Sequence, residues 1–223
     1  MTRWNGYNAY LFDIDGTLLN CKDAVHYFAF CEALHMLSGR PLNLEGVVAH
    51  GNTDVGILRD ALQLAGVAEG AWRPRLQEAL NIMCRRVEQN KADLRAETLP
   101  LVHEVLQHLK ARGAVLGVAT GNLACIGRLK LKASDLLPYW NFGGYSDAFE
   151  YRRDVFAAAL LQARRLAGDA ARVCVVGDTP ADIQAGHANG LDVIAVATGI
   201  YSHEQLAAEH PEFCVTSFAE LLA

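Results

Sequence analysis

The chain of 223 residues is 52% hydrophobic and carries a formal net charge of −5 at pH 7. This composition suits one large core, or a core with a smaller satellite domain, and it excludes a general nucleic-acid binder, which needs clustered Lys and Arg. No apolar run reaches the ~18 residues that a membrane span requires, and no signal peptide opens the chain. We therefore expect a cytoplasmic protein with no nucleic-acid or membrane partner.

The six cysteines are spread along the chain without a Cys-x-x-Cys pair. Several of them lie in apolar runs, where a thiol packs as a small hydrophobic group. We expect free thiols in a reducing compartment, in preference to disulfides or a zinc site. The six residues are Cys21, Cys31, Cys84, Cys125, Cys174 and Cys214.

A short apolar segment near the start of the chain ends in two carboxylates. Residues 8–12 and Ile14 have the length and the branched or aromatic side chains of a buried parallel strand, and Gly16 ends it. Asp13 and Asp15, two residues apart, share one face of a regular strand. Two adjacent carboxylates repel each other unless a cation or a raised pKa relieves the repulsion. A Mg²⁺ ion would do so, although an isolated pair of this kind also fits a solvated loop.

A helical block separates this strand from all the others. Apolar residues recur at helical spacing over 24–37, and further helices are expected over 53–64 and 74–89. Residues 21–94 contain almost no strand-like sequence. We expect them to form a helical insertion.

Helices and strands alternate from residue 99 onward, which predicts an α/β fold with a parallel sheet and right-handed crossovers. The core of this fold would comprise residues 1–20 and 95–223. The expected strands cover 114–119, 140–142, 172–177 and 191–196, and the expected helices cover 101–112, 123–132, 154–166 and 181–188.

Polar residues follow the expected strands, at the edge where an open α/β sheet binds its ligands. Their types suit phosphoryl transfer. A carboxylate can attack phosphorus and form an aspartyl-phosphate, and Mg²⁺ is usually held by one or two carboxylates, which Asp13 and Asp178 can supply. The Thr120 hydroxyl, with the backbone amides of Gly121 and Asn122, can surround the transferred group.

Proton transfer requires a further group. A proton must reach the leaving oxygen and later be taken from water, and Asp15 has the position for both steps. Asp182 follows Asp178 by four residues, and a basic residue is expected after Gly144.

Three segments together resemble the haloacid dehalogenase superfamily of phosphohydrolases. Residues 12–18 read FDIDGTL, residues 119–122 read ATGN and residues 175–182 read VVGDTPAD, which are similar to the first, second and fourth motifs of that family. In this order the three segments are highly specific. The resemblance covers essentially the whole chain, and the helical insertion over 21–94 looks like the α-helical cap of the family.

The resemblance implies a Rossmann-like core and a Mg²⁺-dependent phosphatase that acts on a small phosphorylated metabolite. It implies Asp13 as nucleophile and Asp15 as general acid and base. Mg²⁺ would be bound by Asp13, the Asp15 carbonyl and Asp178, and Asp182 would lie behind the metal or contact a water on it. Alternatives are a phosphomutase or phosphonatase of the same fold, or a catalytically silent binding protein. We expect a monomer or a homodimer.

The third motif departs from the family pattern. Relatives usually place a lysine before the helix that follows the third strand, whereas residues 150–156 read EYRRDVF. Some relatives carry arginine at this point, so we assign the phosphate-binding and catalytic role to Arg152, with Arg153 as the alternative. Arginine binds phosphate as a planar fork. In a third interpretation both arginines cap a solvated helix end.

The helical insertion also carries a family signature. Residues 50–54 read HGNTD and look like the Gly-x-Thr-Asp turn in the caps of phosphoglycolate phosphatases and β-phosphoglucomutases, where the x position is often basic. Asn52 occupies that position, and with Thr53 it is a candidate substrate contact. Equally, Thr53 and Asp54 can simply cap a helix.

Other polar residues are expected to have structural roles. His26 and His35 flank Cys31 at spacings that do not favour a metal site, so ordinary packing is expected. Lys130 and Lys132 are expected on a solvated helix face.

Overall fold

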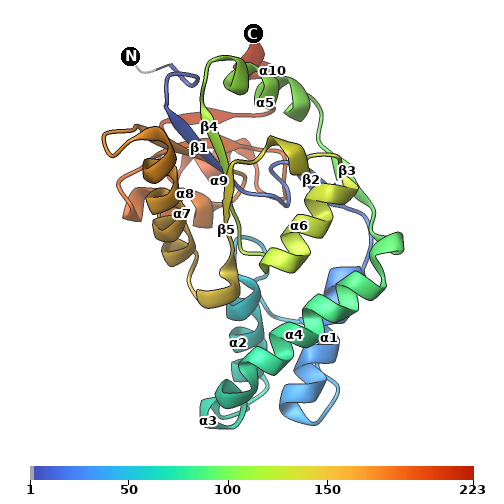
Figure 1. Ribbon diagram of the computed structural model, residues 1–223. Coiled ribbons are helices and arrows are strands. Elements are labelled where there is room, and N and C mark those ends of the chain that lie inside the picture. Colours follow the sequence, from blue (N-terminus) through green and yellow to red (C-terminus); the bar gives the residue numbers. More distant parts are fainter. Residues whose placement is uncertain (1–2) are drawn as a thin grey trace.

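The computed structural model describes residues 3–223. Its main sheet has six parallel strands in the order β5-β4-β1-β6-β7-β8, and helices cover both faces (Figure 1). The predicted α/β fold with a parallel sheet is confirmed. The strands are β1 (Ala9–Phe12), β4 (Val115–Ala119), β5 (Phe142–Gly144), β6 (Val173–Gly177), β7 (Asp192–Val196) and β8 (Phe213–Val215).

Strand β1 lies inside the sheet, between β4 and β6. Its side chains alternate between two hydrophobic clusters, because successive residues of a strand point to opposite faces. Tyr10 and Phe12 enter one cluster, whereas Ala9 and Leu11 enter the other. Both faces are therefore buried, which is why β1 reads as a continuous apolar run.

Helices from different parts of the chain cover the two faces of the sheet. One face packs against α5 (Val102–Ala111), α6 (Ala124–Ala133) and α10 (Ala219–Leu222). The other packs against α7 (Arg152–Ala167), α8 (Pro180–Ala188) and α9 (His203–Ala207). Short 3₁₀ helices are η1 (Arg73–Arg75), η2 (Lys91–Asp93), η3 (Leu137–Tyr139) and η4 (Ser146–Ala148). Within residues 3–223, no helix combines the length and the apolar character needed to cross a membrane.

Four helices form a separate layer beyond the carboxyl end of the sheet (Figure 1). This helical layer consists of α1 (Val25–Ser38), α2 (Asp54–Leu64), α3 (Glu69–Trp72) and α4 (Leu76–Gln89). It has its own hydrophobic cluster, to which Leu123 and Ile126 near the start of α6 also belong. Packing of the layer therefore involves the helix that follows β4.

The chain enters and leaves the helical layer through a pair of antiparallel strands, β2 (Leu19–Cys21) and β3 (Ala96–Thr98). Sequence periodicity did not predict this pair. Each strand has three residues, too few to display a period of two. Strand β8 at the edge of the main sheet was missed for the same reason.

A disulfide joins Cys84 of α4 to Cys125 of α6, with a Cα–Cα distance of 5.7 Å. The prediction of six free thiols is therefore wrong for these two residues. Packing of α4 on α6 brings them together, and their spacing in the sequence gives no sign of it. Because disulfides are typical of oxidising compartments, cysteine use no longer argues for a reducing cytoplasm. The free thiols among the described residues are Cys21, Cys31, Cys174 and Cys214.

The turn after β1 brings the chain against the end of β6. Gly16 has φ +82°, in the left-handed region that favours glycine, and a Cβ there would lie 2.3 Å from Oδ2 of Asp178. Next to it, the Thr17 hydroxyl donates a 2.7 Å hydrogen bond to Oδ1 of the same carboxylate. A Cβ at Gly199, after β7, would lie 1.8 Å from Oδ2. Asp178 is thus held between two glycine backbones.

The disulfide should contribute measurably to stability. It spans a sequence separation of 41 residues, for which the chain-entropy model gives about 4 kcal/mol. We expect Cys84→Ser to lower the Tm by about 10 °C without reductant, measured by calorimetry. Cys31→Ser, in the same helical layer, is the matched control and should change the Tm far less. An identical wild-type Tm with and without reductant would contradict the crosslink.

Close packing around Gly16 predicts that alanine is not tolerated there. Gly16→Ala should lower the free energy of unfolding through its left-handed φ and also through collision with Asp178. Gly113→Ala is the matched control, because Gly113 has φ +79° but no neighbouring atom within 4 Å of the added Cβ. Urea unfolding should therefore show a larger loss for Gly16→Ala. Equal losses would show that the contact with Asp178 is loose.

Candidate active site

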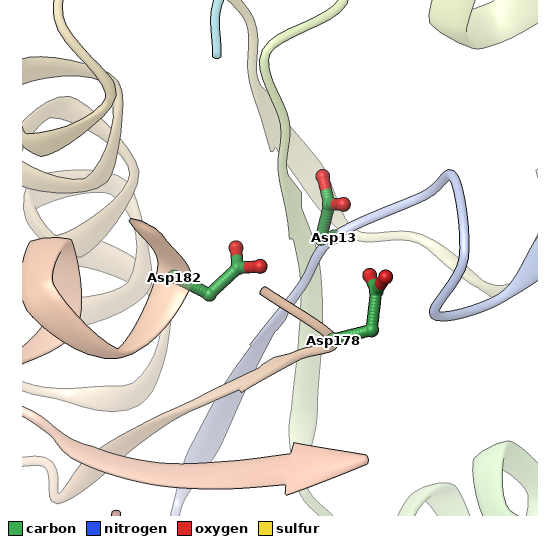
Figure 2. Close-up of side chains that lie close together, drawn as sticks. All are labelled: Asp13, Asp178 and Asp182. Atoms are coloured by element: carbon green, nitrogen blue, oxygen red, sulfur yellow. The ribbon is translucent and has the colours of Figure 1, made fainter. Parts of the chain in front are cut away.

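Three buried carboxylates meet at the carboxyl end of the main sheet. Asp13 follows β1, Asp178 follows β6 and Asp182 lies in the first turn of α8, as Figure 2 shows. One oxygen from each lies within 4.8 Å of the others. Parallel strands that end at one edge thus bring together residues up to 169 positions apart in the chain.

Arg152 is the cation that faces this cluster. Its Nη2 lies 2.8 Å from Oδ1 of Asp13, and its Nε donates a 2.9 Å hydrogen bond to Oδ1 of Asp182. The side chain is buried. By contrast, the Arg153 side chain is 67% exposed and pairs with Asp154. Among the two candidates, the structure brings Arg152 to the cluster, and its burial excludes the interpretation of a solvated helix cap.

The position of Arg152 depends on where α7 begins. The helix was expected from residue 154, but it starts at Arg152, directly after Tyr151 in extended conformation. Asp154 therefore lies within the first turn of α7. Ion pairs with Asp13 and Asp182 hold Arg152 in the first helical position, and such tertiary contacts are not visible in local sequence.

Asp182 uses both of its oxygens within the protein. While Oδ1 contacts Arg152, Oδ2 accepts a 2.7 Å hydrogen bond from the Thr179 hydroxyl and a 3.1 Å bond from the Thr179 amide. The Thr179 hydroxyl in turn accepts from the Asp182 amide, so the two residues form a capping box at the start of α8. Asp182 is therefore fixed in place by α8 and by Arg152.

Asp15 lies beside this cluster with a different partner. Nζ of Lys130 in α6 lies 2.8 and 2.7 Å from its two oxygens, and Asn122 donates a 2.8 Å hydrogen bond to Oδ2. The expectation that Lys130 lines a solvated helix face is wrong, because Lys130 is buried. Lys132 is exposed as expected. Helical spacing did not reveal which polar side chain of α6 points toward the strand ends.

Burial and neighbouring charges shift the pKa values of these acids. Burial raises the pKa of Asp13 to about 6, although Arg152 opposes this shift. Burial, followed by the charges of Asp13 and Asp182, raises the pKa of Asp178 well above its ordinary value. For Asp15, whose side chain is only partly buried, the loss of water contacts raises the pKa but is outweighed by Lys130, which lowers the pKa of that carboxyl. The negative charge at Asp13 and Asp178 is thus incompletely compensated.

Residues of the turn before α2 contact the strand ends from the helical layer. Thr53 caps α2 by accepting a 2.9 Å hydrogen bond from the Gly56 amide. The Asp54 amide donates to the Gly121 carbonyl at 2.7 Å, and a Cβ on Gly121 would lie 2.1 Å from the Asn52 carbonyl oxygen. The helix-capping interpretation of Thr53 is therefore confirmed, whereas a contact of Asn52 or Thr53 with substrate stays a prediction.

Asp13, Asp15 and Arg152 border one cavity of about 250 Å³ between the sheet edge and the helical layer, whereas Asp178 lines a neighbouring cavity together with Asp15. The lining of the first cavity includes Cys21, His26, Phe30 and Lys130, which sequence reasoning did not place at the site. His26 packs against Phe30 as expected, with ring centroids 4.7 Å apart, but it also faces the cavity. His26 is the second residue of α1, and nothing in its sequence context predicts that its side chain faces the cavity. The other lining residues include Asp13, Asp15, Asn52, Thr120, Gly121, Asn122 and Arg152.

The site can be compared with known proteins. The family model for haloacid dehalogenase-like hydrolases matches residues 7–190. A Dickeya dadantii protein named "Probable phosphatase IndB" is 30% identical over 95% of this chain and 90% of its own length. The pyrophosphatase PpaX of Bacillus pumilus is 27% identical over 97% of this chain and 95% of its own length.

Further relatives extend the comparison. The phosphoglycolate phosphatase of Yersinia pseudotuberculosis is 25% identical over 100% of this chain and 94% of its own length. Among solved structures, CbbY from Rhodobacter sphaeroides in complex with phosphate has a TM-score of 0.69 at 19% identity, over 96% of both chains. That likeness supports the fold. The family match and the relatives named as phosphatases show that this chain is a phosphoric monoester hydrolase. This chain therefore belongs to the haloacid dehalogenase-like hydrolases.

Proposed function

We propose that this enzyme is a Mg²⁺-dependent phosphatase that hydrolyses a small phosphorylated metabolite through an aspartyl-phosphate on Asp13. The observation that carries the proposal is the buried cluster of Asp13, Asp178 and Asp182 opposite the guanidinium of Arg152. Relatives named as a pyrophosphatase and a phosphoglycolate phosphatase support a small anionic phosphate compound as substrate.

The donor set suits a magnesium ion. Asp178 accepts a hydrogen bond from Thr17, but within residues 3–223 it has no ion pair, so its charge calls for a cation. We assign the metal to the carboxylates of Asp13 and Asp178 and to the Asp15 carbonyl. Asp182 has both oxygens in use and would orient Arg152. When bound, Mg²⁺ would supply neutralisation of the phosphoryl oxygens and of the carboxylates around them.

Asp13 would attack phosphorus as the leaving oxygen departs. Arg152 holds Oδ1 of Asp13, and its Nη1, which donates one N–H to the Gly51 carbonyl at 3.3 Å, keeps a second N–H in the same plane for phosphate. The Thr120 hydroxyl accepts a 2.8 Å hydrogen bond from Asn122, so its own proton is available to a phosphoryl oxygen. Backbone amides of Gly121 and Asn122 complete the group of donors around the transferred phosphoryl.

Asp15 would move the protons. It would protonate the leaving oxygen in the first half of the reaction and take a proton from the water that hydrolyses the aspartyl-phosphate in the second half. Its side chain is 40% exposed, so one edge of the carboxylate is accessible from the cavity.

We further propose that residues 21–94 act as a cap over a core of residues 1–20 and 95–223. Thr53 donates a 2.7 Å hydrogen bond to the Glu150 carbonyl, just before α7, and both carboxylate oxygens of Glu150 pair with arginines of the helical layer. Those arginines are Arg59 and Arg73. Closure of the cap would exclude water while the leaving group lies near Asn52 and Thr53.

A phosphate-release assay over a panel of phosphorylated metabolites tests the function directly. We expect turnover that requires Mg²⁺ and that falls by about 10⁴-fold or more in Asp13→Asn, because the nucleophile is lost. Asp169→Asn, at an exposed loop position, is the control and should retain full activity. Turnover that survives in Asp13→Asn, or no turnover across the panel, would contradict the proposal.

The assignment of Arg152 predicts unequal effects at two adjacent arginines. Arg152→Ala should lower kcat/KM by about 10²- to 10³-fold, since a donor to the transferred group is removed. Arg153→Ala is the matched control and should behave like the wild type. Folding is checked by circular dichroism, because Asp13 and Asp182 lose their cation. A similar loss in both variants would contradict the assignment.

The raised pKa of Asp13 predicts that metal binding depends on pH. An acid with a pKa of about 6 in the folded protein, above its unfolded value, stabilises the metal-free fold at low pH. That contribution is lost as pH rises through 6, where the carboxylate becomes available to Mg²⁺. Added Mg²⁺ should therefore raise the Tm more at pH 7.5 than at pH 5, and Asp13→Asn should reduce the difference, because the raised pKa of Asp178 contributes the rest. An equal Mg²⁺ effect at both values would refute this account.

A further inference from the structure

Lys130 is a buried lysine in the last turn of α6, with only 3% of its surface exposed. Burial of an ammonium group costs several kcal/mol unless the charge is paired and its donors are used. All three N–H donors have acceptors at 2.7 or 2.8 Å, two of them on Asp15 and the third on the Asn122 side-chain oxygen. Because all three N–H donors of its ammonium group have acceptors, the Lys130 side chain is held in one position.

The same contacts hold the Asp15 carboxylate in place. Both of its oxygens contact Lys130, and Oδ2 also accepts from Asn122, whose amide nitrogen donates to the Thr120 hydroxyl as well. The network therefore connects Asp15 to the turn after β4. Asp15 itself lies on the turn at Gly16, and the Cys21 thiol is a further side-chain partner of its carboxylate.

We propose that Lys130 is a positioning residue for the hydrolysis, which holds the Asp15 carboxylate at the angle needed for proton transfer. This inference rests on the proposed function. The two buried cations at the site have different partners. Arg152 contacts Asp13 and Asp182, whereas Lys130 contacts Asp15. Lys130 also offsets the charge of Asp15, which lowers repulsion toward an approaching phosphate ester.

Two other roles are distinguishable from this one. If Lys130 only anchored α6, its loss would lower stability and leave the chemistry unchanged in the folded fraction. If it bound phosphate directly, its loss would raise KM and weaken inhibition by inorganic phosphate. A positioning role predicts a fall in kcat with KM and phosphate inhibition unchanged, because only the proton-transfer group is displaced.

The experiment begins with Lys130→Met, which keeps the length of the side chain and removes its charge and donors. Substrates are an alkyl phosphate and 4-nitrophenyl phosphate. Because the alkyl leaving group needs a proton more than the nitrophenolate does, kcat should fall by about 10²-fold for the first and less than about 10-fold for the second. Lys132→Met, exposed on the same helix, is the matched control and should match the wild type.

A double-mutant cycle with Asp15→Asn decides whether Lys130 acts through Asp15. Lys130→Met should lower kcat for the alkyl phosphate strongly in the wild type but less than about 2-fold in the Asp15→Asn background. Equal losses in both backgrounds would overturn the inference and favour a direct contact with substrate. Unchanged kcat in Lys130→Met would overturn it too.

Folding and the underlying function are checked separately. Thermal unfolding and circular dichroism establish that each variant is folded. If Lys130→Met does not fold, Lys130→Gln, which keeps one amide donor toward Asp15, takes its place with the same expected pattern. Absence of Mg²⁺-dependent turnover in the wild type would contradict the proposed function itself, whereas an active wild type with an equally active Lys130 variant would contradict this inference alone.

Discussion

Arg152 contacts two carboxylates that come from distant parts of the chain, Asp13 after β1 and Asp182 in α8. Without this guanidinium the sheet edge would hold three buried acids with no cation among the described residues that contact them, at a cost of several kcal/mol for each unpaired charge. The ion pairs therefore hold the start of α7, the capping box of α8 and the end of β1 in one arrangement. They still leave Asp178 uncompensated, and this remaining charge is what makes a divalent metal fit the site.

The backbone packs closely around the uncompensated carboxylate of Asp178. The left-handed turn at Gly16 and the backbone at Gly199 approach Asp178 more closely than any side chain would allow. On the opposite side of the site, Lys130 compensates Asp15 separately. One carboxylate can thus face phosphorus and a neighbouring one can exchange protons, because each has its own cation. The helical layer covers both through the turn at residues 50–54.

Sequence patterns predicted much of this arrangement. Apolar runs ending in Asp13 and Asp178 located the central strands, and the family motifs indicated which strand ends belong together. What the patterns missed depends on packing between elements. The disulfide of Cys84 and Cys125 forms because α4 packs on α6, and Lys130 is buried because α6 turns that face toward the sheet edge. Short strands such as β8 have too few residues to show alternation.

The stereochemistry at phosphorus tests the central claim most directly, that Asp13 attacks the phosphate ester before water does. A phosphorothioate ester made chiral at phosphorus by one oxygen isotope would be hydrolysed in water that carries a third oxygen isotope, and the configuration of the chiral inorganic thiophosphate analysed by NMR. Two successive in-line displacements, first by Asp13 and then by water, predict retention of configuration. Inversion would mean that water attacks the substrate in a single step, and it would contradict the account.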